Sequence, residues 1–206
     1  MKSERIPVKS FSADNGFIGK MQKLVREEVL PYQYNILNDA IPGIEKSHAI
    51  ENIRLAAEKL RGKDVKPDEF YGMVFQDSDV AKWIEAAAYA LAAGEDPELE
   101  KAVDETIQLY GASQHEDGYV DSYFTVKCPD KMWTNICDAH ELYCAGHMME
   151  AAVAYYEVTG KRELLDIMSK SADCIYEQFM KKNTRAYPGH PEVELALMRL
   201  WLSLIH

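Results

Sequence analysis

The chain has 206 residues, with 23 Lys and Arg against 34 Asp and Glu, so its formal net charge is −11. This acidic balance argues against a nucleic-acid-binding protein, because such proteins neutralise phosphates with clustered basic residues. Hydrophobic residues make up 47 % of the chain and charged residues 28 %, a composition typical of a globular domain and too apolar for a disordered one.

Neither a membrane span nor a secretory signal is visible in the sequence. No apolar run reaches the roughly 20 residues that cross a bilayer, and no apolar segment follows the charged residues after Met1. None of the cysteines belongs to a Cys-x-x-Cys pair. The four are Cys128, Cys137, Cys144 and Cys174. We therefore expect free thiols in a cytoplasmic protein without a nucleic-acid or membrane partner.

Helical periodicity dominates from residue 17 onwards, while residues 1–16 are expected to form an extended N-terminal segment. A first amphipathic helix is predicted over residues 17–39, broken or kinked at Pro31. A second is predicted from Ser47, whose hydroxyl can cap it, to a glycine at residue 62. The polar, proline-containing stretch that follows is typical of a loop.

Two pairs of helices come next, and each pair has a short connection. The third helix begins near Asp77 or Ser78, whose side chains can cap it, and the fourth begins at Pro97. The same pattern returns over residues 138–158 and 162–179. Because short connections make neighbouring helices antiparallel, the sequence predicts repeated helical hairpins.

A last amphipathic helix starts at Pro191, and apolar residues still arrive at core spacing in Leu204–His206. A helix without a partner leaves its apolar face exposed, which repeat proteins avoid with a polar capping unit. We therefore expect an all-α chain of about seven helices, with residues 1–206 as a single incomplete, truncated domain. Self-association through the exposed last helix is a further expectation.

The first candidate site lies where the third helix begins. Gln76, Asp77 and Asp79 place amide and carboxylate groups beside aromatic rings, and this chemistry binds sugar hydroxyls. The alternative is helix capping by Asp77 or Ser78, with Asp79 complementing the helix dipole.

The second candidate combines Cys137, His140, Cys144 and His147 within one predicted helix. These residue types suit zinc. However, the outer pair would lie about 15 Å apart at 1.5 Å per residue, which is too far for one ion. The alternatives are small residues that face the core, or a pocket lined by the two histidines and Tyr143.

Two loops carry further candidates. His190 lies between Gly189 and Pro191, and this stiff backbone suits either a ligand contact or a simple helix cap. Residues 114–124 combine an Asp-Gly turn with aromatic residues in an expected short extended segment. These rings fit either sugar stacking or a lid over a core.

Together these motifs resemble glycoside hydrolase family 127, the β-L-arabinofuranosidases. The matching motifs, in the order of the family, are Glu69–Trp83, Gln114 with Asp117–Tyr119, His140–Tyr155 and Gly189–Leu197. The resemblance covers residues 17–200 and implies helical hairpins that form part of an (α/α)6 toroid. It also implies a hydrolase that releases β-L-arabinofuranose or a related sugar from oligosaccharides or glycoconjugates. His140, His190, Gln76 and Asp77 would then be substrate-binding residues.

The catalytic motif of the family has no match in this sequence. In this family a zinc-bound cysteine thiolate is the nucleophile and a glutamate is the acid/base, both in the later part of the barrel. None of the four cysteines here falls in the matching motif. The resemblance therefore implies the N-terminal part of a catalytic domain, inactive alone, with no catalytic residue, metal ligand or cofactor of its own. A non-catalytic carbohydrate-binding or helical-repeat interaction module and a sugar epimerase or isomerase on a similar toroid are the alternatives.

Overall fold

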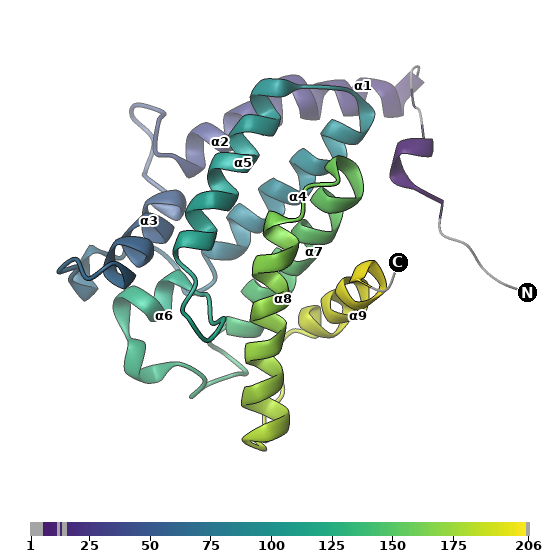
Figure 1. The fold of residues 1–206 in the computed structure, drawn as a ribbon. Helices are drawn as coiled ribbons and strands as arrows, with labels where there is room; N and C mark the ends of the chain where they lie inside the picture. The colour runs from purple at the N-terminus through teal and green to yellow at the C-terminus, as the bar shows by residue number, and fades with distance from the viewer. Residues whose placement is uncertain (1–5, 12, 14–15, 205–206) are drawn as a thin grey trace, which may run out of the picture.

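Helices joined by loops make up the chain, as a computed structural model of residues 6–11, 13 and 16–204 shows (Figure 1). Nine α-helices and no strand occur among these residues, which confirms the all-α expectation. The α-helices are α1 (Gly16–Leu24), α2 (Leu30–Leu37), α3 (Ala49–Leu60), α4 (Asp77–Ala93), α5 (Pro97–Ala112), α6 (Ser122–Lys127), α7 (Glu141–Thr159), α8 (Glu163–Tyr176) and α9 (Glu192–Leu204). Three 3-10 turns are η1 (Val8–Ser10), η3 (Pro67–Glu69) and η4 (Pro129–Lys131), and two π-helical turns are η2 (Val25–Val29) and η5 (Glu177–Lys181).

The helices exceed the expected seven for two local reasons. The first expected helix is divided into α1 and α2 by η2. The prediction of a short extended segment within residues 114–124 is wrong in part, because residues 122–127 form α6. Its N-cap is Asp121, whose carboxylate accepts a hydrogen bond from the Phe124 N–H at 3.0 Å. The expected extended segment over residues 1–16 lies partly outside the described residues, and η1 forms within it.

Pro31 does not end the first helix but follows the π-helical turn directly, as the second residue of α2. Proline has no N–H to donate to the carbonyl four residues earlier, and its ring crowds that carbonyl. The wider turn removes this conflict, and the Leu30 N–H donates to the Val25 carbonyl, five residues back. The chain therefore continues from α1 through η2 into α2 with an irregularity at the proline.

The expected hairpins are present and form two layers (Figure 1). Helix α4 packs against α7, and α7 packs against α9, so these three helices lie side by side. Helices α5 and α8 contact each other and lie in front of α4 and α7 in the figure. Hairpins α4–α5 and α7–α8 thus each contribute one helix to either layer.

The main core lies between these layers. Helix α7 is buried on nearly every side because α4, α8 and α9 all pack against it. Met148, Met149 and Tyr155 of α7 are fully buried, together with Ile84 of α4 and Leu165 of α8. Burying apolar side chains in this way stabilises a fold by about 1.5–3 kcal/mol each.

Helix α9 lies at one edge of the layer formed by α4, α7 and α9, and it leaves apolar side chains exposed. Leu195, Met198 and Trp201 are each more than half exposed. This confirms the expected exposed face on the last helix, although Ile205 and His206 lie outside the described residues. Within the part of the chain that the structure covers, no helix combines the length and apolarity needed to cross a membrane.

Candidate functional site

Five ring-bearing side chains gather at the N-terminal ends of α7 and α9. The rings of His140 and His190 have centroids 5.3 Å apart, although 50 residues separate them in the sequence. Tyr143 lies 5.6 Å from His140 and 5.1 Å from His190, and its ring meets His147 edge-on at 4.4 Å. Phe75, just before α4, lies 5.4 Å from His140. We call these five residues the histidine cluster.

The local backbone geometry sets the orientation of the His140 ring. The residue is the N-cap of α7 and adopts a left-handed conformation, with φ 61°. Its Nδ1 lies 2.6 Å from the carbonyl oxygen of Asp138. A carbonyl oxygen can only accept, so Nδ1 carries a proton and Nε2 of the neutral ring is left as an acceptor. Non-glycine residues in this conformation are uncommon and cluster at functional sites.

A polar stripe continues the cluster along α4 and α7. Ser78 and Lys82 lie one turn apart on α4, and Tyr143 and His147 lie one turn apart on α7. The Lys82 ammonium group donates to the Tyr143 hydroxyl at 2.9 Å and to the Ser78 hydroxyl at 3.2 Å. Residues spaced by a helical turn therefore place a cation and hydroxyl groups beside the histidine rings.

His147 faces the first turn of α9. Its Nδ1 lies 3.4 Å from a carboxylate oxygen of Glu192. Burial, reinforced by the nearby Lys82 charge, lowers the pKa of His147 below its usual value. The ring is therefore mostly neutral at pH 7, and its contact with Glu192 joins α7 to α9 without a full imidazolium charge.

A group of ion pairs lies further along α4, α7 and α9, towards their C-terminal ends. Arg199 of α9 pairs with Glu150 of α7 and approaches Glu85 of α4 at 3.7 Å. Burial raises the pKa of Glu150, while the Arg199 guanidinium opposes that shift. One Glu150 oxygen, Oε1, is buried without a hydrogen-bond partner among the described residues. These ion pairs connect α4, α7 and α9 to one another.

Gln76 supports the loop that carries Phe75. Its side-chain amide donates to the Ser47 carbonyl at 3.1 Å, and its amide oxygen accepts from the Met73 N–H at 3.0 Å. The half-buried Gln76 amide therefore connects two loops beside the histidine cluster.

Asp77 is buried and binds Ser122, not the first turn of α4. Its carboxylate accepts from both the N–H and the hydroxyl of Ser122. The expected capping of α4 by Asp77 is therefore wrong: the N-cap is Gln76, without a side-chain cap. The structure brings His140 and His190 together, whereas the Asp77 carboxylate binds Ser122. Sugar binding by Gln76 and Asp77 stays a prediction.

The zinc interpretation of the Cys and His residues fails on geometry. Cys137 and His140 precede α7, while Cys144 is buried within it. Burial raises the pKa of the Cys144 thiol well above its usual value, so it stays protonated. Among the described residues, no group of three His, Cys, Asp or Glu side chains could hold a metal ion. These residues do not fit zinc.

The aromatic residues of the 114–124 loop cover a core. Tyr119 and Phe124 are almost fully buried in a small apolar cluster with Cys174. The Tyr119 hydroxyl donates to the Glu141 carboxylate at 2.7 Å. The lid interpretation is therefore confirmed, and these two rings are not available for sugar stacking.

Sequence reasoning missed Lys82, Glu192 and Arg199 as members of the site. Lys82 lies one turn after Ser78, and Glu192 lies two residues after His190. Helical spacing could have placed Lys82 on the same face as Ser78. It could not show which residues of α7 and α9 would lie opposite.

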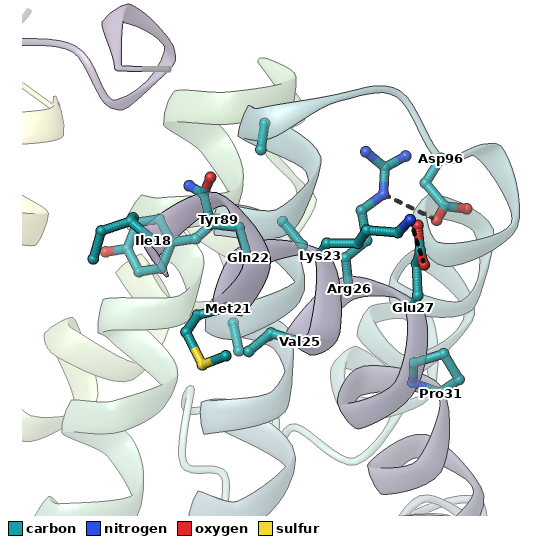
Figure 2. Close-up of a pocket in the computed structure, with 13 residues that line it drawn as sticks. Ile18, Met21, Gln22, Lys23, Val25, Arg26, Glu27, Pro31, Tyr89 and Asp96 are labelled. Carbon is teal, nitrogen blue, oxygen red and sulfur yellow. Dashed lines mark ion pairs between the residues drawn. The ribbon is translucent and has the colours of Figure 1, made fainter. Parts of the chain in front are cut away.

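A cavity of about 980 Å³ lies elsewhere, between the α1–η2 segment and α4 (Figure 2). Ile18, Met21 and Val25 form part of its apolar lining. Arg26 approaches Asp96 at 3.7 Å on its charged side, as Figure 2 shows. The polar lining of this cavity includes Gln22, Lys23 and Arg26, and neither His140 nor His190 lines it.

Comparisons with known proteins agree on one family. Residues 12–203 match the model of the β-L-arabinofuranosidase GH127 catalytic domain. The non-reducing end β-L-arabinofuranosidase of Bifidobacterium longum subsp. longum is 42 % identical over an alignment of 195 residues, and this match covers 85 % of this chain and 28 % of that protein.

Two solved structures are similar as well. A GH127 β-L-arabinofuranosidase from Geobacillus stearothermophilus T6 is 52 % identical with a TM-score of 0.83, over 91 % of this chain and 29 % of that one. A second GH127 β-arabinofuranosidase is 30 % identical with a TM-score of 0.83, over 96 % of this chain and 31 % of that one. The chain thus spans less than a third of the length of these relatives.

Proposed function

Because the chain belongs to glycoside hydrolase family 127, we propose that it supplies the N-terminal part of an (α/α)6 toroid that binds β-L-arabinofuranose or a related sugar. The proposed activity is hydrolytic release of that sugar from oligosaccharides or glycoconjugates. The observation that supports the sugar site is the approach of His140 and His190 to 5.3 Å beside Tyr143.

The chemistry of the histidine cluster suits a sugar. A sugar ring offers hydroxyl groups at its edge and C–H groups on its faces, so it needs polar partners and an aromatic surface. The free Nε2 of His140 can accept from a hydroxyl, and the Lys82 ammonium group can donate to one. Phe75 is 37 % exposed beside His140 and supplies an apolar ring.

The role of this chain in the reaction is to bind and orient the sugar. The family resemblance implies a zinc ion that keeps a cysteine thiolate deprotonated, held by residues outside this sequence. The described residues do not fit that ion, so we assign no catalytic residue and no metal ligand here. We expect no hydrolysis by this chain alone, and L-arabinose release that is lost in His140→Ala would contradict this.

Binding of methyl β-L-arabinofuranoside to the full chain tests the proposed site. We expect the glycoside to shift the ¹H–¹³C signals of the His140 and His190 rings. His140→Ala and His190→Ala should each weaken binding by about tenfold or more, since a hydrogen bond to a charged or well-placed group contributes about 1–3 kcal/mol. His115→Ala is the matched control, because His115 contacts Thr125 at 2.9 Å away from the cluster.

Unchanged affinity in both histidine variants would contradict the proposed site. Equal affinity for methyl α-D-glucopyranoside would contradict the proposed sugar class while leaving the site in place.

We also propose self-association and a cytoplasmic location. The exposed face of α9 is an apolar surface of the kind that marks contacts between proteins. Four free cysteines are in keeping with a reducing compartment.

A further inference from the structure

Two glycines lie where another segment comes too close for a side chain. At Gly146 in α7, a Cβ atom would lie 2.8 Å from Cγ of Glu192 and 2.9 Å from the backbone nitrogen of Val193. At Gly189, a Cβ atom would overlap the backbone carbonyl oxygen of Cys137. Real Cβ atoms essentially never approach other atoms so closely, so an alanine would force the neighbouring backbone to move.

The two contacts bracket the histidine pair. Gly189 directly precedes His190, and it meets residue 137, three positions before His140. On the other side, Gly146 follows His140 by six positions and meets the first residues of α9. The segments that carry the two rings are therefore in close contact both before and after the rings.

We propose that Gly146 and Gly189 are positioning residues that set the separation of the His140 and His190 rings. Both contacts involve backbone atoms, which cannot turn aside as the end of a side chain can. An alanine at Gly189 moves the His190 loop away from residue 137. An alanine at Gly146 moves the first turn of α9, and with it Glu192, the partner of His147 at 3.4 Å. The consequence for sugar binding rests on the proposed function, whereas the ring separation does not.

Gly111 of α5 is a matched control for these substitutions. A Cβ atom there would approach only the Ile167 side chain, at 2.8 Å from Cδ1. That atom is the end of a flexible side chain, and the contact lies between α5 and α8. Gly111→Ala therefore makes the same chemical change in a helix without disturbing the histidine cluster.

The experiment compares the full chains of wild type, Gly189→Ala, Gly146→Ala and Gly111→Ala. The first measurement is the NOE between the His140 and His190 ring protons in the free protein, which needs no ligand. We expect it to fall at least twofold in the first two variants and to stay unchanged in the control. The second measurement is affinity for methyl β-L-arabinofuranoside, where a displacement near 1 Å should cost about tenfold or more.

The outcomes separate this inference from the proposed function. An unchanged NOE in both Gly189→Ala and Gly146→Ala overturns the inference, whatever happens to sugar affinity. A reduced NOE with unchanged affinity supports the positioning role and contradicts the proposed sugar site. Loss of cooperative thermal unfolding in both variants, with Gly111→Ala still cooperative, also overturns the inference, because the glycines would then determine folding.

Discussion

Asp77 and Ser122 join the first turn of α4 to the first turn of α6 across 45 residues of sequence. The Asp77 Oδ2 atom accepts from the Ser122 N–H at 2.8 Å, and Oδ1 accepts from the Ser122 hydroxyl. Both side chains are buried, at 3 % and 1 % exposure. Because Phe75 lies two residues before Asp77, this contact also holds one side of the histidine cluster.

Removing the Asp77 carboxylate should destabilise the chain. Asp77→Ala leaves the buried N–H and hydroxyl of Ser122 without their acceptor, and an unsatisfied buried polar group costs about 1–3 kcal/mol. Ser122→Ala should cost less, because the backbone N–H keeps its partner. Urea unfolding of both variants and of the double variant measures the coupling between the two residues. Additive effects would contradict a direct interaction.

Asp121 gives the chain a pH-dependent stability. Its Oδ1 caps α6, whereas its Oδ2 is buried without a hydrogen-bond partner among the described residues. Burial, reinforced by the charge of Asp77, raises the pKa of Asp121 well above its usual value. The folded state therefore holds this proton at a pH where the unfolded chain, with a pKa of about 3.9, has released it. The contribution of Asp121 to stability is therefore complete below the unfolded-state pKa, and it is lost as the pH rises from there through the folded-state pKa.

Asp121→Asn should reduce this loss of stability. The amide oxygen still caps α6, and the buried charge is gone, so the variant should be less sensitive to pH by about 1.4 kcal/mol for each unit by which the pKa is raised. Urea midpoints measured between about pH 4 and pH 7 test this expectation. Asp130→Asn, at an exposed position, is the control. An equal pH dependence in Asp121→Asn and wild type would contradict the assignment.

The hairpins could be predicted because their signals are local. Pro97 starts α5 and Gly160 ends α7, and apolar residues at helical spacing mark the buried faces. The meeting of His140 with His190 was expected only through the family resemblance. No local pattern indicates that residues 50 positions apart lie next to each other.

The misassigned residues depend on contacts that local sequence cannot show. Asp77 has the residue type and the position of a helix cap, but its hydrogen-bond partner is Ser122 on another helix. Helix α6 has only six residues, and its stability depends on the Asp121 cap and on burial against α3. Short helices have weak periodicity, so tertiary contacts decide their structure.

Arg199 should be needed for stability through Glu150. Arg199→Met removes the cation that faces a nearly buried carboxylate. Loss of one partner from a fully buried pair costs about 3–5 kcal/mol, and we expect about 2 kcal/mol here because Arg199 is partly exposed. The raised pKa of Glu150 should rise further, which adds a loss of stability as the pH increases.

Glu150→Gln in the Arg199→Met background should restore much of that stability, because it removes the unpaired charge. Thermal unfolding of the single and double variants at neutral pH provides the measurement. If the double variant is no more stable than Arg199→Met alone, packing of the arginine stem and not the charge pair accounts for the loss.

Self-association should depend on the exposed face of α9. Leu195, Met198 and Trp201 follow one another at three-residue spacing, so they share one side of the helix and form a contiguous apolar surface. Leu195→Glu and Trp201→Glu should shift the chain towards monomer in sedimentation velocity, because each puts a charge where apolar contact is needed. Tyr176→Glu, at a residue of α8 that is 55 % exposed, should leave the distribution unchanged. A wild-type chain that sediments as a monomer at high micromolar concentration would contradict self-association through α9, and an equal effect of Tyr176→Glu would show that added charge alone is responsible.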